Sequence, residues 1–362
     1  MPADLTLDLR ADVVDLTRAV CDIKSVSGNE GPLADAVESA LAELDGLEVL
    51  RDGNVVVART SLGRDERVVL AGHLDTVPLS AARNLPTTRR GGELYGRGTC
   101  DMKGGVAVQL RLAATLADEP ERQTRDVTYV FYDGEEVEAV RNGLGRIARQ
   151  QPELLDADFA VLLEPSNGTV EGGCNGTMRV DVTALGVAAH SARSWIGHNA
   201  IHEAAAILTR LNAYDPREVE VEGLVFREGL NAVLIRGGVA GNVIPDRCVV
   251  SVNYRFAPST TVEEAFEHLQ DVFEGYDVAL TDAAPGARPG LDQAAAKAFV
   301  ATVGEPPKAK YGWTDVSRFS ALGVPAVNFG PGDPNLAHTD DEHVPLDQVR
   351  HCEEVLHGWL TS

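Results

Sequence analysis

The sequence predicts an α/β protein in which a mostly parallel, helix-covered sheet carries a smaller inserted α/β module. In the first half of the chain, short and nearly continuous apolar segments, typical of strands buried on both faces, alternate with helix-like segments. After the glycine-rich stretch at 171–176, the expected order becomes strand, helix, strand, strand, helix, strand. This order is the ferredoxin-like arrangement, so we expect a second sheet of a different kind.

The strands of the main sheet are expected where apolar and β-branched residues run between turn signals. In chain order, the first half predicts strands at 54–59, 67–75, 127–132 and 158–165, with a helix from about 105 to 117. After the insertion the pattern resumes with a helix near 291–303, a strand at 325–330 and a final helix from Leu346.

The inserted module is expected to contain four strands and two helices. The strands fall at 178–185, 231–238, 247–256 and 276–282, and the helices at 198–214 and 261–273. The segment at 283–290, AAPGARPG, is a natural hinge because proline and glycine interrupt regular structure. We therefore expect a main domain formed by 1–176 and 290–362, and an inserted domain at 177–289.

Composition excludes several classes of partner. The chain has 362 residues with 32 Lys and Arg against 55 Asp and Glu, and its formal charge of −23 repels phosphate backbones and anionic membranes. Its apolar runs fall short of the ~18 residues that a membrane span needs. The amino terminus lacks the features of a secretory signal, and five widely spaced cysteines form no CxxC motif. We expect a cytoplasmic protein that binds neither nucleic acid nor membrane.

Acidic and imidazole side chains recur where the predicted strands end. In open parallel sheets, ligands bind beyond the carboxyl ends of the strands, so these groups should converge. In an extended strand, the adjacent Glu135 and Glu136 would point to opposite faces and could serve two different purposes. The groups are His73, Asp75, Asp101, Glu135, Glu136, Glu164 and His338.

Two histidines with three or four carboxylates are too rich in oxygen for a structural zinc site. They suit two divalent ions roughly 3.5 Å apart that share a carboxylate, with one further carboxylate left as a base. Each residue alone also has a simpler interpretation, as an exposed charge or a hydrogen-bonded histidine. The glycine-rich stretch at 96–105 could instead be an anion-binding helix start, although it lacks the P-loop spacing. The repeated placement at strand ends favours the metal site.

Seven motifs in order resemble the co-catalytic di-zinc aminoacylase/carboxypeptidase metallohydrolase family. They are GHLDTVP (72–78), GRGTCDMKGG (96–105), the Glu135–Glu136 pair, LLEPS (162–166), AAHSARSW (188–195), GNVIPD (241–246) and AHTDDEHV (337–344). The resemblance covers nearly the whole chain and implies two Zn²⁺ ions per subunit, with Co²⁺ as a substitute metal. It also implies a homodimer formed through the inserted domain.

The resemblance implies a role for each site residue. Asp101 would bridge the two ions, His73 and Glu164 would complete one metal site, and Glu136 and His338 would complete the other. Asp75 would accept the second N–H of the His73 ring, and Glu135 would be the proton-transferring base. His190, in the inserted domain, would reach the partner subunit's active site and stabilise the oxyanion.

Substrate contacts are implied at Asn242, Arg255 and Thr314, with Arg255 suited to a carboxylate, although a surface arginine is also common at a strand end. Two positions depart from the family pattern. Gly134 separates Asp133 from the glutamate pair, where the family commonly has Pro-Asp or Thr-Asp directly before it. Cys174 stands where relatives carry an arginine, and Arg179 lies nearby as a substitute.

The implied activity is hydrolysis of an N-acyl amino-acid amide. N-succinyl-LL-2,6-diaminopimelate, an intermediate of lysine biosynthesis, is the first expected substrate, and the products would be succinate and the free amine. Acetylornithine deacetylase or another N-acyl-amino-acid or dipeptide hydrolase of the same family is the alternative, because the family shares one metal site. A non-catalytic metal-binding relative is a further alternative, but this sequence keeps both the ligands and the base.

Overall fold

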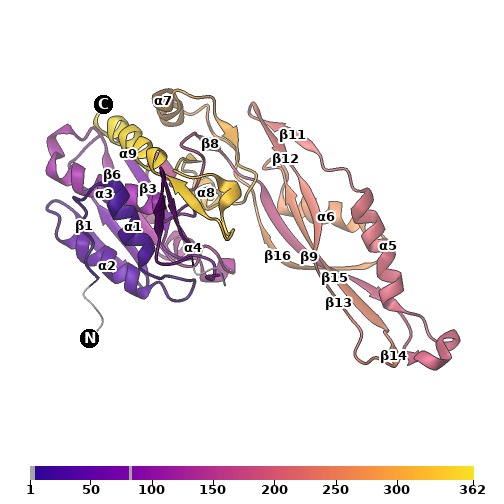
Figure 1. Ribbon diagram of the computed structural model, residues 1–362. Coiled ribbons are helices and arrows are strands. Elements are labelled where there is room, and N and C mark those ends of the chain that lie inside the picture. Colours follow the sequence, from indigo (N-terminus) through magenta and orange to yellow (C-terminus); the bar gives the residue numbers. More distant parts are fainter. Residues whose placement is uncertain (1–4, 81–83) are drawn as a thin grey trace. The chain divides into compact units, whose positions relative to one another are not determined.

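The computed structural model describes residues 5–80 and 84–362, which form two compact units (Figure 1). Unit 1 contains the described residues through Gly172 together with 290–308 and 318–362. Unit 2 contains residues 173–289 and 309–317. Unit 1 is therefore assembled from three segments of the sequence that alternate with the two segments of unit 2.

Within the described residues, unit 1 is built on an eight-stranded sheet of order β1-β2-β6-β3-β7-β18-β8-β17. The central strands β6, β3, β7 and β18 are parallel, which confirms the predicted mostly parallel core of an α/β fold. The strands are β1 Glu48–Asp52, β2 Val55–Arg59, β3 Arg67–His73, β6 Asp126–Tyr132, β7 Phe159–Leu162, β8 Glu171–Gly172, β17 Lys308–Ala309 and β18 Ala326–Asn328.

The strand at one side of this core runs against the others. β2 is antiparallel to β6, and β1 is antiparallel to β2. β1 and β2 form a tight hairpin, in which Asp52 pairs with Val55 across two residues that include Gly53 at φ +59°. Two strands joined by so short a turn must be antiparallel.

Both faces of the sheet are covered, since every residue of β6 and of β7 is buried. Helix α3 packs against β3, α1 and α9, while α2 packs against β1 and β2. One apolar core joins these elements. The helices are α1 Val13–Asp22, α2 Gly31–Ala42, α3 Lys103–Asp118, α4 Gly143–Gln150, α7 Ala294–Val303, α9 Leu346–Thr361 and α8 Val316–Ala321, whose first two residues belong to unit 2.

A small antiparallel sheet of order β19-β5-β4 brings two distant segments of unit 1 together. Its strands are β4 Thr88–Arg90, β5 Glu93–Tyr95 and β19 His343–Pro345, and His343 pairs with Tyr95. The loop that follows β5 and the loop that precedes β19 are therefore neighbours.

Unit 2 contains an antiparallel sheet of order β13-β15-β9-β16 with its own apolar core. Its main strands and helices follow one another in the order β9 Gly176–Leu185, α5 Ala200–Ala213, β13 Gly229–Gly237, β15 Arg247–Phe256, α6 Val262–Val272 and β16 Asp277–Ala284. A hairpin that the sequence did not predict, β11 Glu218–Val221 with β12 Leu224–Arg227, lies between α5 and β13. A short pair, β10 Ala189–His190 with β14 Val243–Ile244, completes the unit.

None of the helices in the part of the chain that the structure describes has both the length and the apolar character that crossing a membrane requires.

Candidate metal centre

The candidate site in unit 1 lies where the central parallel strands end. His73 is the last residue of β3, Glu135 and Glu136 follow β6, and Glu164 follows β7. His338 lies in the loop between β18 and β19, and Asp101 lies between β5 and α3. The strand order places β6, β3 and β7 side by side, so their carboxyl ends deliver these side chains to one edge of the sheet.

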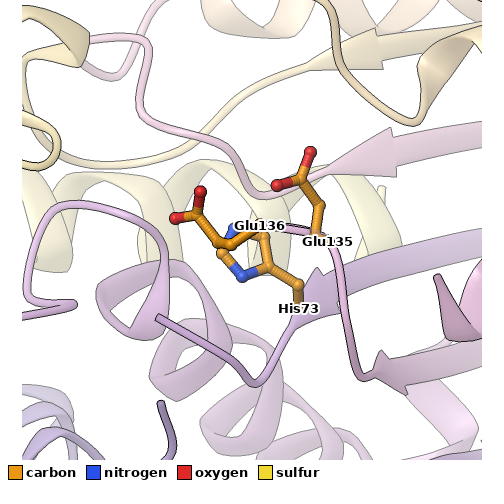
Figure 2. Close-up of side chains that lie close together, drawn as sticks. All are labelled: His73, Glu135 and Glu136. Atoms are coloured by element: carbon orange, nitrogen blue, oxygen red, sulfur yellow. The ribbon is translucent and has the colours of Figure 1, made fainter. Parts of the chain in front are cut away.

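The ligand-type atoms form two overlapping groups that share Asp101. His73, Asp101 and Glu164 each place one such atom within 4.8 Å of the other two, and so do Asp101, Glu136 and His338. A third group consists of His73, Glu135 and Glu136, whose ligand-type atoms also lie within 4.8 Å of one another. Figure 2 shows the two glutamate side chains rising from the same turn near the His73 ring.

The two carboxylate oxygens of Asp101 face different imidazole rings. Oδ1 lies 3.2 Å from Nε2 of His73, and Oδ2 lies 3.3 Å from Nε2 of His338. Nε2 of His338 also lies 2.9 Å from Oε1 of Glu136. An aspartate placed in this way can offer one oxygen to each of two cations.

Close packing of acids and imidazoles perturbs their pKa values. Hydrogen bonds with Asp101 and Glu136 raise the pKa of His338 to about 10. Burial alone would lower the pKa of His73, but its contacts with Asp101 and Asp75 raise it well above its usual range. Burial raises the pKa of Glu136. The cluster thus concentrates negative charge that needs a positive counterpart, and its imidazole and carboxylate donors fit divalent transition-metal ions.

Asp75 is fully buried and connects the His73 ring to the glutamate turn. Its Oδ1 accepts a hydrogen bond from the backbone N–H of Glu135 (3.0 Å), and its Oδ2 accepts one from that of Glu136 (3.1 Å). Nδ1 of His73 lies 3.0 Å from the Asp75 backbone oxygen and 3.5 Å from Oδ1. Nε2 of His73 is thereby left facing the cluster.

The sequence did not predict a further hydrogen-bond donor to the Asp75 carboxylate. The hydroxyl of Ser27 donates to Oδ2 of Asp75 at 2.8 Å. The two glutamate N–H contacts were not predicted either, because backbone donors have no signature in a sequence. The Asp75 carboxylate therefore accepts three hydrogen bonds in addition to its contact with the His73 ring.

The backbone at the glutamate pair is a turn, not a strand. β6 ends at Tyr132, so the strand geometry that would send Glu135 and Glu136 to opposite faces does not apply, and both have an atom close to His73. Gly134 has φ +68°, a conformation that favours glycine. A Cβ atom at this position would lie 2.6 Å from the backbone oxygen of Arg141. The departure from the family pattern at Gly134 thus has a physical reason in this chain.

The residues predicted in the inserted domain all lie in unit 2, where they form separate groups. His190 pairs with Val243, and the N–H of Ser191 donates to the Asn242 oxygen at 3.0 Å, so His190 and Asn242 are neighbours. They lie near the Arg247 end of β15. Arg255 lies eight residues further along β15, roughly 26 Å away at the usual rise of a strand.

Thr314 and Cys174 contact each other inside unit 2. The Cys174 side chain is buried, and its Sγ lies 3.7 Å from the backbone oxygen of Thr314. Burial raises the pKa of the Cys174 thiol to about 11, so the residue packs as a neutral group and offers no charge to a carboxylate. Arg179 is exposed on β9, in register with Asn253.

Comparison with known proteins places this geometry in a family. The model of peptidase family M20/M25/M40 matches residues 69–362. A putative succinyl-diaminopimelate desuccinylase of Mycobacterium tuberculosis is 56% identical over 357 residues, covering 98% of this chain and 99% of that protein. The succinyl-diaminopimelate desuccinylase of Corynebacterium glutamicum is 48% identical and covers 98% of each chain.

A solved structure shares the fold at much lower sequence identity. The crystal structure of a tripeptidase from Staphylococcus aureus matches with a TM-score of 0.79 at 23% identity, covering 98% of both chains. The family model matches most of the chain, and the desuccinylases match it from end to end. The chain belongs to peptidase family M20/M25/M40.

Proposed function

We propose that the protein is a metal-dependent amidohydrolase that cleaves N-succinyl-LL-2,6-diaminopimelate into succinate and LL-2,6-diaminopimelate. The observation that carries the reaction type is Asp101, which is shared between two groups of potential ligands beside an additional glutamate. The substrate is proposed from the two relatives named for this activity, which match the chain over its full length.

The proposed ligands divide between two zinc ions. His73 and Glu164 would hold one ion, Glu136 and His338 the other, and Asp101 both, in agreement with the two groups of three. Zinc suits the mixed imidazole and carboxylate donors, and Co²⁺ would be a working substitute. When bound, the ions would polarise the scissile carbonyl and lower the pKa of a water molecule.

Glu135 is the proposed general base and acid. It would take a proton from the attacking water, whose oxygen joins the acyl carbon, and deliver that proton to the leaving nitrogen as the amide bond breaks. Its backbone N–H is bound to Asp75, so its position is fixed relative to His73. Asp75 is therefore proposed to position the base as well as the ring.

A homodimer is proposed because unit 2 exposes apolar side chains on an edge strand and on a neighbouring helix. β13 lies at the edge of its sheet, with Val233, Leu234 and Ile235 each about half exposed. Ile201 and Leu208 of α5, which packs beside β13, are also exposed. An edge strand with an apolar face invites pairing with a second copy.

His190 is proposed to act in the partner subunit's active site, as an oxyanion donor. The separation of the two groups in unit 2 supports this role. His190 and Asn242 lie at one end of β15 and Arg255 lies at the other, so one small substrate cannot contact both groups from the same protomer. Asn242, Arg255 and Thr314 are proposed substrate contacts, with Arg255 binding a carboxylate.

The decisive experiment is a substrate panel on the zinc-reconstituted protein. We expect kcat/KM for N-succinyl-LL-2,6-diaminopimelate to exceed that for N-acetylornithine and for dipeptides. A preference for the acetyl substrate would replace the proposed substrate, and turnover of none of them with two zinc ions bound would favour a non-catalytic relative.

Catalysis across the dimer can be tested by mixing two inactive variants. Glu135→Ala lacks the base and His190→Ala lacks the oxyanion donor. In a mixed dimer, one site has its own Glu135 and receives the partner's intact histidine. Random pairing should then restore roughly a quarter of native activity. Mixtures that stay inactive would reject the role of His190 in the partner's site.

A further inference from the structure

Two loops of unit 1 that carry proposed ligands are joined by a buried ion pair outside the ligand groups. The loop of residues 96–101 leads from β5 to Asp101, and the loop of residues 337–342 leads from His338 to β19. Arg97 belongs to the first loop and Glu342 to the second. Their side chains are only 4% and 1% exposed, and Nη1 of Arg97 lies 2.6 Å from Oε2 of Glu342.

Glu342 holds the loop that carries Asp101. Its Oε1 accepts backbone N–H groups from Gly98 (2.8 Å), Cys100 (3.2 Å) and Asp101 itself (3.3 Å). A carboxylate that receives several N–H groups in this way fixes the course of the backbone around it. Glu342 therefore sets the position of the backbone from which the shared aspartate projects.

Arg97 holds the loop that carries His338. Besides its ion pair with Glu342, Nη1 of Arg97 donates to the backbone oxygen of Thr339 at 3.2 Å. Thr339 is the residue directly after His338, and it is exposed to solvent. His338 has φ +66°, which is uncommon for a residue other than glycine and persists only where the surroundings hold it. Each loop thus supplies the side chain that fixes the backbone of the other loop.

We propose that Arg97 and Glu342 form a clasp that positions Asp101 and His338 for the second cation. This inference rests on the proposed two-cation site. The group Asp101–Glu136–His338 takes two of its three members from the clasped loops. The group His73–Asp101–Glu164 takes only Asp101 from them, while β3 and the segment after β7 supply the others. Weakening the clasp should therefore affect the second cation more than the first.

The test is Glu342→Gln, which keeps the shape of the side chain but removes its charge. One amide oxygen cannot serve both Arg97 and the three N–H groups. Metal content by mass spectrometry and stepwise Zn²⁺ and Co²⁺ titration by calorimetry are the readouts. We expect one of the two dissociation constants to rise by about 10- to 100-fold, the usual effect of losing a group that orients metal ligands. The other constant should change much less.

Asp126→Asn is the matched control in the same unit. Asp126 is also a buried carboxylate that accepts three backbone N–H groups, from Leu62, Gly63 and Arg64, but this loop carries none of the proposed ligands. This variant should lose thermal stability and keep both metal constants. If Glu342→Gln does not fold, Arg97→Lys provides the test. Lysine keeps the positive charge, but its shorter side chain cannot contact both Glu342 and the Thr339 oxygen as Arg97 does. It should show the same selective weakening.

The outcomes separate this inference from the proposed function. Selective weakening of the second cation supports the clasp. Native affinities in Glu342→Gln, or equal weakening of both cations, overturns the clasp while the native two-cation site stands. A native chain that binds fewer than two cations overturns both the proposed site and this inference.

Discussion

Replacing Gly134 by alanine should impair the glutamate turn far more than the same change at a comparable glycine elsewhere. Gly134 has φ +68°, and an added Cβ would lie 2.6 Å from the backbone oxygen of Arg141. Gly91 has φ +60°, and a Cβ there would meet nothing within 4 Å. The pair therefore separates backbone strain, which both positions share, from a collision that occurs at Gly134 alone.

The magnitude follows from these two contributions. A left-handed backbone costs a residue with a Cβ about 1–2 kcal/mol, which is the whole effect expected for Gly91→Ala. At Gly134 a collision with backbone is added, which costs about 1–3 kcal/mol more. To restore a contact of 3.0 Å from 2.6 Å, the chain must move by about 0.4 Å. That shift falls on the residue next to Glu135, where a misplacement of about 1 Å can cost 10²-fold in rate.

Thermal unfolding and steady-state kinetics on both variants test the reasoning. For a unit of this size each kcal/mol corresponds to a change in Tm of about 2–4 °C, so Gly134→Ala should unfold several degrees below Gly91→Ala. We expect kcat/KM to fall roughly tenfold in Gly134→Ala and to stay native in Gly91→Ala. Equal Tm values and equal kcat/KM for the two variants would refute the argument.

Three further changes have defined outcomes. Glu135→Ala should lower kcat by at least ~10²-fold with metal content unchanged. Glu138→Ala, at an exposed neighbouring position, should leave kcat unchanged. Loss of metal from Glu135→Ala would show that the roles of the two glutamates are misassigned. Burial alone would raise the pKa of Asp126, but hydrogen bonds from Leu62, Thr60 and Arg64 lower it, so its contribution to stability is present above about pH 4 and lost as pH falls through the folded pKa. Asp126→Asn should therefore destabilise the protein by about 1–3 kcal/mol at pH 7, and a gap in Tm from native that persists unchanged at acidic pH would contradict this cause. Chelation should abolish turnover and lower Tm, and Zn²⁺ should restore both; turnover that survives metal removal, confirmed by mass spectrometry, would exclude the proposed mechanism.

The central strands and the side chains at their ends were predictable because they leave strong signals in the sequence. β3, β6 and β7 are mostly apolar runs, and a charged or imidazole group ends or follows each. One rule, that parallel strands present their carboxyl ends at a common edge, then suffices to bring these groups together. The sharing of Asp101 between two ions was implied by the family resemblance and stays a proposal, supported by the two oxygens of Asp101 that face different imidazole rings.

The clasp and the small sheet that brings its two loops together could not be predicted by the same reasoning. Strands β5 and β19 have three residues each, too few to show a periodic pattern, and their pairing joins segments far apart in the chain. Arg97 and Glu342 both lie within motifs that the family resemblance had singled out, yet their contact depends on that pairing. The hairpin of β1 and β2 did leave a signal in the sequence, the turn at Gly53. This turn makes β1 and β2 antiparallel, although the core strands of the same sheet are parallel.

The interrupted course of unit 1 has a consequence for synthesis on the ribosome. β18, a central strand beside β7, and the loop of His338 are translated only after nearly all of unit 2 has emerged. Unit 2 can thus form its sheet early. Until β18 is made, β7 in the first 172 residues lacks this partner strand and exposes an apolar strand edge. We expect a chain that stops before Pro325 to protect 173–289 from protease and to leave the earlier segment sensitive. Equal protection of both segments would show that β18 is dispensable for folding.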